Sequence, residues 1–437
     1  MKDITVIGAG YVGLVTSACL VELGNKVSCI DTDKEKIRQL HQAIIPFYEP
    51  RLKELVEKGL ENDMLSFSES YEGISENSEI FIICVGTPPQ SDGSTNISYV
   101  CESAKGIAKN IKRDSIVFIK STVPVGTNEL ISSIIKENLS TELDIEVASH
   151  PEFLKEGDAV RDFMEPDRII IGTFSELVKK TAHEVYKSLN LQKDKIIFIS
   201  PKAAELTKYA ANSFLATKIS FMNELSLLAD NLSIDINEIR RGIGSDKRIG
   251  EYFLYAGLGY GGSCFPKDID SLIDTYKKNN IESAILSSVK QVNENQLTSF
   301  LSKILDYYTI KDLKSKVLLI WGLSFKPNTD DIRESVSLKL IQKLSTQVKE
   351  LKLYDPVAIP NSREFLKDIN NITFLDNQYQ YIERCDSLII CTEWENFLDP
   401  DYTHISKLKD KVIFDGRNIL NKNKAKEFGL KYMGIGC

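Results

Sequence analysis

A glycine-rich turn near the start of the chain limits the possible folds of this sequence more than any other feature. Gly8, Gly10 and Gly13 form the pattern G-x-G-x-x-G directly after the apolar run "ITVIG". A helical pattern of small residues follows, and a second strand-like run, "KVSCID", ends at Asp31. Strand, glycine turn, helix and strand in this order are typical of a dinucleotide-binding βαβ unit. The alternative is a structural βαβ turn that holds no cofactor.

Each residue of this pattern has a physical role in that interpretation. Gly8 permits the tight turn, Gly10 lets a pyrophosphate approach the backbone, and Gly13 lets helix and strand pack closely. The start of the helix offers free N–H groups and a positive dipole end to the phosphates. Asp31 can accept hydrogen bonds from a ribose. Because an acid repels the extra phosphate of NADP, Asp31 favours NAD.

The rest of the chain predicts an α/β fold with two Rossmann-like doubly wound domains, joined by a helical middle region with a long central helix. The apolar runs "EIFIICVG", "SIVFIKST", "IEVASH" and "RIIIG" predict buried parallel strands, so residues 1–200 form the first domain. The run from Ala203 to about Leu232 has helical spacing without Pro or Gly. We expect a helical connector or subunit interface at 201–300 and a second α/β domain, without the glycine pattern, at 301–437.

Composition narrows the functional classes. The 437 residues carry a formal net charge of −8, which argues against non-specific nucleic-acid binding. No apolar run approaches about 18 residues, so no membrane span is expected. The eight cysteines form no C-x-x-C pair and there are only four histidines, which argues against zinc and disulfides. We therefore expect reduced thiols in a cytoplasmic protein, with no metal and no leader before the first strand.

One cysteine lies in an unusual setting, the stretch "GYGGSCFPKD". The glycines allow unusual backbone angles and the close approach of a ligand. The residues after Cys264 can open a helix with Pro266 in its first turn. A thiol at a helix start and near Lys267 is expected to have a lowered pKa, as a nucleophile requires. Asp268 could orient a water or a cation. The alternative is a flexible loop with an incidental thiol.

Further polar residues follow predicted strands. Thr87 in "VGTPP" and Thr122 in "KSTVPVGT" would present hydroxyls where a doubly wound sheet binds ligands, although plain turn chemistry explains the same residues. Glu152 and Glu156 share one face if "SHPEFLKEGDA" is helical and are merely near each other if it is a loop. His150 by itself is expected to be structural.

Lys208 and Asn212 lie four residues apart in the predicted long helix. They point together either into a cleft or into solvent. A dinucleotide and a nucleophilic cysteine together suggest one chemistry. A thiolate traps an aldehyde as a thiohemiacetal, hydride loss gives a thioester, and water releases an acid. A dehydrogenase that stops at the aldehyde needs no such cysteine.

Eight motifs in order resemble the UDP-glucose 6-dehydrogenases of the UDP-glucose/GDP-mannose dehydrogenase family, over essentially the whole chain. They are "GAGYVGL", "VGTPP", "KSTVPVGT", "HPEFLKEG", "ELTKYAAN", "GYGGSCFPKD", "FKPNTDDIRES" and "FDGRN". The resemblance implies four-electron oxidation of UDP-glucose to UDP-glucuronate with two NAD⁺. GDP-mannose or a UDP-N-acetylhexosamine is the alternative substrate.

The resemblance also implies roles for single residues. Cys264 matches the nucleophile, Lys208 a lysine that stabilises the oxyanion, and Asp268 an acid that organises water. Thr122 and Glu152 match residues that assist through that water or as acid and base. The motif match leaves open which group removes the first alcohol proton.

Two sets of contacts are implied as well. The expected cofactor contacts are Gly8, Gly10, Tyr11, Val12, Gly13, Asp31, Lys36, Thr87, Thr122, Glu156, Lys267 and Arg333. The expected substrate contacts are Glu152, Phe153, Leu154, Lys155, Lys208, Asn212, Arg248, Tyr255, Gly259, Gly261, Lys326 and Arg417. In the family, the arginine matched by Arg248 crosses a dimer interface, so a homodimer built on the long helix is expected.

Two other functional classes are compatible with the dinucleotide turn. A non-catalytic NAD-binding sensor would release no NADH, and the set of Lys208, Cys264, Lys267 and Asp268 argues against it. A simple alcohol dehydrogenase would release one NADH per substrate and leaves Cys264 unexplained.

Overall fold

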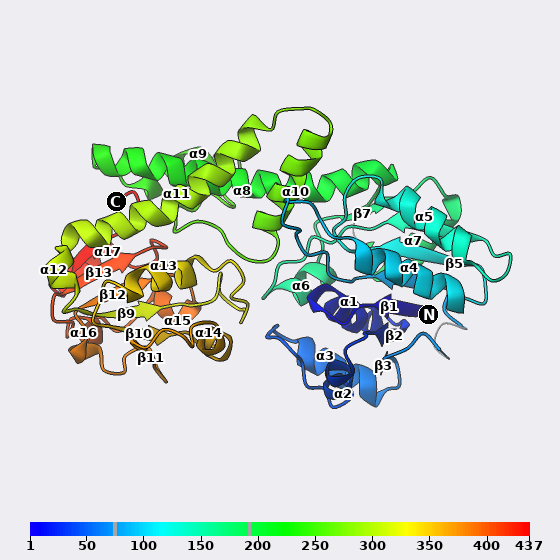
Figure 1. Ribbon diagram of the computed structural model, residues 1–437, viewed down its shortest axis with the longest axis horizontal. Coiled ribbons are helices and arrows are strands. Elements are labelled where there is room, and N and C mark those ends of the chain that lie inside the picture. Colours follow the sequence, from blue (N-terminus) through cyan, green and yellow to red (C-terminus); the bar gives the residue numbers. More distant parts are fainter. Residues whose placement is uncertain (73–76, 191–193) are drawn as a thin grey trace. The chain divides into compact units, whose positions relative to one another are not determined.

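The computed structural model describes residues 1–72, 77–190 and 194–437. The chain divides into two compact units, Met1–Ala211 with Asp270–Thr275, and Asn212–Ile269 with Tyr276–Cys437. Each unit contains one open sheet (Figure 1).

The sheet of the first unit has eight strands within the described residues, in the order β3-β2-β1-β4-β5-β6-β7-β8. Its strands are β1 (Asp3–Ile7), β2 (Lys26–Ile30), β3 (Leu65–Ser68), β4 (Ile80–Ile83), β5 (Ser115–Ile119), β6 (Ile145–Ser149), β7 (Ile169–Gly172) and β8 (Ile196–Ile199). The chain reverses strand order between β1 and β4, which is where doubly wound sheets bind their ligands.

Helices cover both faces of this sheet (Figure 1). They are α1 (Tyr11–Glu22), α2 (Lys34–Leu40), α3 (Leu52–Glu61), α4 (Ser98–Asn110), α5 (Thr127–Asn138), α6 (Ala159–Met164) and α7 (Glu176–Val185), with a 3-10 helix at Lys187–Asn190. Side chains from α1, α3, α6 and α7 build one apolar core, and α4 and α5 build the other. Strands such as β4 and β5 are buried along their length because both faces are covered.

One expectation for this sheet is wrong. The run "RIIIG" does form the buried strand β7, but β7 pairs antiparallel with β6, through Ser149 and Gly172. The next pair, β7 with β8, is parallel again. A strand buried on both faces is a continuous apolar run whichever way it points, so its direction cannot be read from the pattern.

Long helices follow the first sheet. The run without Pro or Gly forms α8 (Pro201–Leu232), which confirms the predicted long helix. After it come α9 (Ile236–Gly244), α10 (Phe265–Lys278), α11 (Ala284–Tyr307) and α12 (Ile310–Leu313). Among the described residues, no helix is long and apolar enough to cross a bilayer.

The sheet of the second unit has six described strands, all parallel, in the order β11-β10-β9-β12-β13-β14. They are β9 (Val317–Trp321), β10 (Glu350–Tyr354), β11 (Ile372–Phe374), β12 (Ser387–Ile390), β13 (Val412–Asp415) and β14 (Lys431–Met433). The helices are α13 (Val336–Ser345), α14 (Ile359–Phe365), α15 (Glu395–Leu398), α16 (Tyr402–Ile405) and α17 (Lys422–Glu427), with a 3-10 helix at Ile382–Arg384. This confirms the predicted second Rossmann-like sheet.

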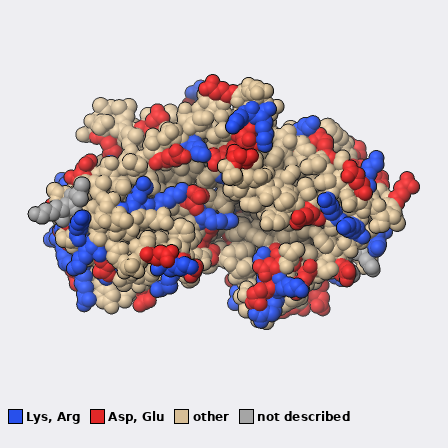
Figure 2. Space-filling model, viewed as in Figure 1, with Lys and Arg blue, Asp and Glu red and all other residues tan. Residues whose placement is uncertain are grey.

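Charged side chains of both signs are interspersed on the face drawn in Figure 2. That face therefore presents no broad field of one sign.

Candidate active site

The turn between β1 and α1 has the geometry that a dinucleotide requires. Gly8 has a φ of +100°, and a Cβ atom on Gly13 would lie 1.7 Å from the Gly8 carbonyl oxygen. A Cβ atom on Gly10 would meet nothing within 4 Å, so the backbone stands open there. Within the described part of the chain, no side chain caps the start of α1 at Gly10. Its first N–H groups therefore remain available for a pyrophosphate, and the turn fits NAD.

Asp31 follows β2 and is a charged acceptor beside this turn. Its carboxylate accepts from the backbone N–H of Ala9 at 2.8 Å, from that of Asp33 at 3.0 Å, and from Lys36 Nζ at 3.0 Å. Burial raises the pKa of Asp31, but these hydrogen bonds and the Lys36 charge bring it below its ordinary value. The group is therefore an ionised acceptor, as a ribose hydroxyl requires.

The loops with Thr87 and Thr122 lie side by side. They follow β4 and β5, which are neighbours in the sheet. Thr87 Oγ1 donates a hydrogen bond to the Thr122 carbonyl oxygen at 2.9 Å. The structure thus places both loops at the carboxyl edge of the sheet, as the sequence predicts.

A buried ion pair joins the loop after β6 to α8. Lys208 Nζ lies 2.9 Å from Glu152 Oε1, and the two side chains are only 4% and 7% exposed. Burial raises the pKa of Glu152, but Lys208 and the Leu154 N–H bring it below its usual range. Lys208 Nζ also lies 5.3 Å from the centre of the Phe153 ring. The alternative of a solvated face is wrong for Lys208.

The segment from Pro151 to Asp158 is a loop, so the helical alternative for Glu152 and Glu156 is wrong. The Glu152 carboxylate bonds the Leu154 N–H two residues on, which is a turn contact rather than a helical one. Helix α6 begins only at Ala159. Glu156 is half-buried on this loop.

Sequence reasoning missed Glu49, which is the acceptor that holds this loop in place. Its buried carboxylate accepts from the N–H groups of Gly157 at 2.6 Å and Ala159 at 2.8 Å, and from the hydroxyl of Tyr11. Tyr11 and Val12 open α1 at the dinucleotide turn. Glu49 lies in an irregular connection, and nothing in its local pattern distinguishes it from a surface acid.

Lys155 is exposed and points away from the buried pair. Its Nζ lies 3.5 Å from Asp158 and 3.2 Å from Asp162. The structure therefore does not bring the Lys155 side chain to Glu152 and Lys208.

In the second unit, Cys264 lies directly before α10. Its carbonyl oxygen accepts the N–H of Asp268 at 2.9 Å, which is the first bond of the helix. Its Sγ lies 3.5 Å from Ser263 Oγ. Pro266 falls in the first turn, as the sequence predicts. The thiol therefore belongs to a helix N-terminus, a setting that favours the thiolate.

Asp268 is the centre of a polar cluster one turn further on. It is 1% exposed, accepts from Lys267 Nζ at 2.7 Å on one oxygen and from Asn212 Nδ2 at 2.6 Å on the other. Asn212 is itself buried, so the solvated-face alternative is wrong for it as well. The structure thus brings three predicted site residues together in this unit.

The glycines before Cys264 are densely packed. Gly259 and Gly262 have φ of +112° and +81°. A Cβ atom on Gly261 would lie 2.2 Å from the Glu334 carbonyl oxygen, and one on Gly262 would lie 2.6 Å from the Phe325 ring. This packing contradicts the flexible-loop alternative. The glycines let the segment run between neighbouring backbone and an aromatic side chain.

Two of the predicted basic residues lie beside this glycine segment. Arg417 Nε donates to the Cys391 carbonyl oxygen at 2.7 Å, and its Nη1 lies 3.5 Å from the Gly259 carbonyl oxygen. The Arg333 carbonyl accepts from Gly262 at 3.0 Å, while its side chain binds Asp331.

The remaining predicted residues lie at more open positions. Lys326 Nζ lies 5.4 Å from the centre of the Phe325 ring. Tyr255 is exposed and stacks under Arg240 at 4.6 Å. Arg248 is 89% exposed and its guanidinium pairs with Asp246.

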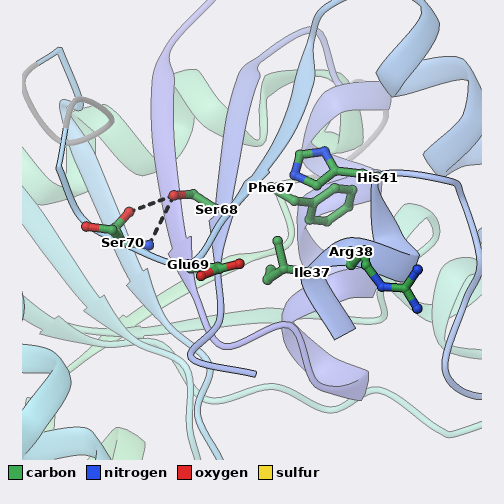
Figure 3. A pocket seen from close by; sticks show the side chains of 7 residues that line it. All are labelled: Ile37, Arg38, His41, Phe67, Ser68, Glu69 and Ser70. Atoms are coloured by element: carbon green, nitrogen blue, oxygen red, sulfur yellow. Dashed lines mark hydrogen bonds between the residues drawn. The ribbon is translucent and has the colours of Figure 1, made fainter. Parts of the chain in front are cut away.

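One hollow of about 440 Å³ lies between α2 and β3 (Figure 3). Its lining residues are Ile37, Arg38, His41, Phe67, Ser68, Glu69 and Ser70. The His41 ring meets the Phe67 ring edge-on at 6.1 Å. None of the predicted site residues lines it, but the carbonyl oxygen of the lining residue Ser68 accepts the backbone N–H of Asp31 at 3.1 Å, so the hollow adjoins the acid beside the dinucleotide turn.

Comparison with known proteins matches three successive parts of the chain to one family. Residues 2–190 match the NAD binding domain of the UDP-glucose/GDP-mannose dehydrogenase family, 202–295 its central domain, and 319–422 its UDP binding domain. The chain belongs to this family. Its members are NAD-dependent oxidoreductases, which confirms the expected enzyme class, fold class and cofactor.

Similar proteins span nearly the whole length. The chain is 40% identical to UDP-glucose 6-dehydrogenase YwqF of Bacillus subtilis, covering 99% of this chain and 97% of that one. It is also 40% identical to a UDP-glucose 6-dehydrogenase of Pseudomonas aeruginosa, covering 99% and 96%. A solved UDP-glucose dehydrogenase from Pyrobaculum islandicum superposes with a TM-score of 0.90 at 36% identity, covering 100% and 98%.

Proposed function

We propose that this protein oxidises UDP-glucose to UDP-glucuronate, a four-electron oxidation of the sugar C6 alcohol that consumes two NAD⁺ and one water. The observation that carries the proposal is Cys264 at the start of α10, one turn before the buried cluster around Asp268. An oxidation that ends at an aldehyde does not require this thiol as a nucleophile. The substrates named for similar full-length proteins support the choice of UDP-glucose.

The first unit supplies the groups that hold the cofactor. The open backbone at Gly10 and the uncapped start of α1 take the pyrophosphate, and Asp31 takes the ribose. Lys36 stays paired with Asp31, and we retain Glu156 as a proposed contact of the first unit. From the second unit we retain Lys267 and Arg333 as proposed cofactor contacts. When bound, NAD⁺ accepts the hydride of each oxidation.

Cys264 carries the second oxidation. Its thiolate adds to the C6 aldehyde, which forms a C–S bond and puts negative charge on the former carbonyl oxygen. The Lys208 ammonium stabilises that oxygen. After loss of a hydride from C6, the thioester carbon takes up water, the C–S bond breaks, and the thiol and the carboxylate are released. Asp268, Thr122 and Glu152 position this water and accept its proton.

The contacts of Glu152 and Asp268 hold the proposed catalytic groups in position for this reaction. Glu152 is ionised beside Lys208, so it can accept a proton, and its charge keeps the buried ammonium in place. Asp268 holds Lys267 and Asn212, which fixes their direction. For the sugar nucleotide we retain Asn212, Lys326 and Arg417, together with the loop from Tyr255 to Gly261.

A homodimer with three functional regions per chain, at 1–200, 201–300 and 301–437, completes the proposal. On α8, Phe214, Phe221, Leu228 and Leu232 are 67%, 54%, 54% and 58% exposed in the single chain. Their spacing places them on one helical face, which is the signature of a helix that packs against a partner. Exposed Arg248 is then available to a partner's substrate. For the location we propose the cytoplasm, where buried thiols such as those of Cys19, Cys29 and Cys84 stay reduced.

The test is the amount of NADH formed per UDP-glucose at limiting sugar. We expect a ratio of about two with UDP-glucuronate as product, following from the thiohemiacetal route. Cys264→Ala should bind NAD⁺ normally and form no acid. A ratio near one, or full acid formation by Cys264→Ala, contradicts the mechanism. Turnover of GDP-mannose or a UDP-N-acetylhexosamine without turnover of UDP-glucose keeps the mechanism and changes the substrate.

A further inference from the structure

A buried chain of three polar side chains lies behind the predicted site of the first unit. Lys120, His150 and Tyr186 are each 4% exposed. Lys120 Nζ lies 3.1 Å from His150 Nδ1, and His150 Nε2 lies 3.0 Å from Tyr186 Oη. Two aromatic rings pack against it: the Phe163 ring centre lies 5.7 Å from Lys120 Nζ, and Phe118 meets the His150 ring edge-on at 5.5 Å.

This row of hydrogen-bonded side chains joins the first residues of two loops. Lys120 follows the last residue of β5, and His150 follows the last residue of β6. The His150 N–H donates to the Ile119 carbonyl at 2.8 Å, so the two loops also share a backbone bond. Two residues beyond these points come Thr122 and Glu152. The Lys120–His150 bond therefore fixes the starting points of both loops that carry proposed catalytic groups.

The protonation states of these three hydrogen-bonded side chains follow from their burial. Desolvation lowers the pKa of His150 well below its ordinary value, so the ring is neutral and carries one N–H. Desolvation also lowers the pKa of Lys120, to about 8, which leaves the amine charged at neutral pH. A charged Lys120 donates to Nδ1, so the ring proton lies on Nε2 and is donated to Tyr186 Oη.

The charged Lys120 acts on the groups that face it. These are the thiols of Cys84 on the β4 side and Cys19 on α1, the Glu152 carboxylate, and the Lys208 ammonium on α8. Both thiols are buried and have raised pKa values, of about 12, so they are neutral. Glu152 therefore lies in the field of two buried ammonium groups: Lys208 is in direct contact, and Lys120 has the weaker influence on the Glu152 pKa.

We propose that Lys120 and His150 are positioning residues for the Thr122 and Glu152 loops, and that the Lys120 charge helps keep Glu152 ionised for the reaction. The inference rests on the proposed function and adds two residues to it. Neither residue touches the reacting atoms, and both act through Glu152.

The test compares two substitutions at the same position. In His150→Asn, the side-chain carbonyl can take the place of Nδ1 and accept from Lys120, whereas His150→Leu offers no acceptor. Lys120→Met removes the charge itself and keeps the length of the side chain. The measurements are kcat/KM for UDP-glucose from pH 5 to 9, NAD⁺ affinity, and thermal unfolding of each variant.

Loss of the Lys120 charge raises the Glu152 pKa. Glu152 is then protonated at a higher pH, so the fall of activity on acidification (the acid limb of the pH profile) begins at a higher pH. We expect the acid limb to move up by up to about one pH unit in Lys120→Met, which lacks the charge, and in His150→Leu, where the buried ammonium loses its acceptor and the neutral amine is favoured. His150→Asn should keep the limb of the unchanged protein, and NAD⁺ affinity should not change in any variant. A folded Lys120→Met with an unmoved acid limb, or identical profiles for His150→Asn and His150→Leu, overturns the proposal.

A second readout separates this inference from the proposed function. The ¹³C NMR titration of the Glu152 carboxylate, assigned with Glu152→Gln, needs no turnover. If the protein does not oxidise UDP-glucose, the proposed function fails, yet a raised Glu152 pKa in His150→Leu still supports the pair. An unchanged Glu152 titration overturns it. If Lys120→Met does not fold, the comparison of His150→Asn with His150→Leu still tests the proposal.

Discussion

The turn after the first strand of each sheet has the same backbone geometry, but the two turns have different surroundings. Gly8 after β1 and Gly322 after β9 both have positive φ, +100° and +92°. Gly8 donates to the last residue of β2 at 2.7 Å, and Gly322 donates to the last residue of β10 at 2.8 Å. The next N–H in each case bonds the acid that follows the second strand, Asp31 or Asp355, at 2.8 and 2.7 Å.

The segments after the two turns differ. In the first sheet, α1 begins at Tyr11, directly after the glycines, so its open N-terminus lies at the turn. In the second sheet, α13 begins only at Val336, after a long loop, and Ser335 caps it. The same turn geometry is thus followed directly by a helix N-terminus in the first sheet and by a long loop and a capped helix in the second.

The two acids diverge as well. Asp31 keeps 12% of its side chain exposed and pairs with the long side chain of Lys36. Asp355 is 1% exposed and also accepts from Ser324, from Ala358 and, at 3.1 Å, from the Trp394 indole. The lone pairs of the Asp355 carboxylate are therefore used by hydrogen bonds within the protein. The same acid at the same place therefore binds a ligand only if the protein leaves part of its hydrogen-bonding capacity unused.

The largest expected effect comes from removing the second acid. Asp355→Ala leaves the buried N–H groups of Leu323, Ser324, Ala358 and Trp394 without their acceptor, which should cost about 4 kcal/mol of unfolding free energy. Urea unfolding measures this. Asp31→Ala is the matched control and should cost far less. Equal losses in the two variants would contradict the comparison.

Next is the close packing of the first turn. Gly13→Ala puts a Cβ atom 1.7 Å from the Gly8 carbonyl oxygen, so α1 must shift, at a cost of about 3 kcal/mol. Gly10→Ala meets no atom within 4 Å and should fold normally, yet its methyl group obstructs the pyrophosphate. Thermal unfolding together with NAD⁺ titration separates the two. Normal NAD⁺ affinity in Gly10→Ala would remove the turn from the cofactor site.

A smaller effect concerns cofactor choice. Asp31→Ala removes the ribose acceptor and the charge that repels a 2′-phosphate, so NAD⁺ affinity should fall about tenfold or more and the preference over NADP⁺ should shrink. Dissociation constants for both cofactors measure it. Asp355→Asn, which alters the corresponding acid of the second sheet, should leave the preference unchanged if it folds; a change there would contradict the division of roles.

The smallest effect is the pH dependence from Asp31. Its folded pKa lies below the unfolded value, so its contribution to stability is present above about pH 4 and is lost as the pH falls through the folded pKa. The melting temperature of Asp31→Asn should therefore lie slightly below that of the unchanged protein at pH 7. The two should converge as acid is added. A difference that persists or grows toward low pH would show that Asp31 does not act through its charge.

Much of the fold could be predicted because local patterns specify it. Buried parallel strands are continuous apolar runs, and a long run without Pro or Gly predicted α8. The antiparallel direction of β7 could not be predicted, since both faces are buried whichever way the strand points. The loop at Glu152 was undecided for a related reason: acids four residues apart suit a helix face, and a single contact to Leu154 settles the turn.

Within the candidate site, the sequence pointed to residues in dense motifs and did not point to isolated ones. Cys264 and Asp268 share a stretch of glycines and charges that is visible in the sequence. Glu49 and the Lys120–His150 pair are visible only when distant segments meet, because a single acid, lysine or histidine has many possible surroundings.

Local sequence patterns were sufficient to predict the glycine turn, the acid after β2, the long helix, the place of the cysteine at a helix start and the second sheet. These depend on backbone sterics, periodicity and the chemistry of neighbouring residues, all of which act over a few positions. Three features depend on segments that meet only in the folded chain: Lys208 is buried against Glu152, the Asp355 carboxylate accepts from the Trp394 indole, and Lys120 is buried against His150. Burial and charge pairing arise between segments far apart in the chain, and they set the ionisation on which the chemistry depends.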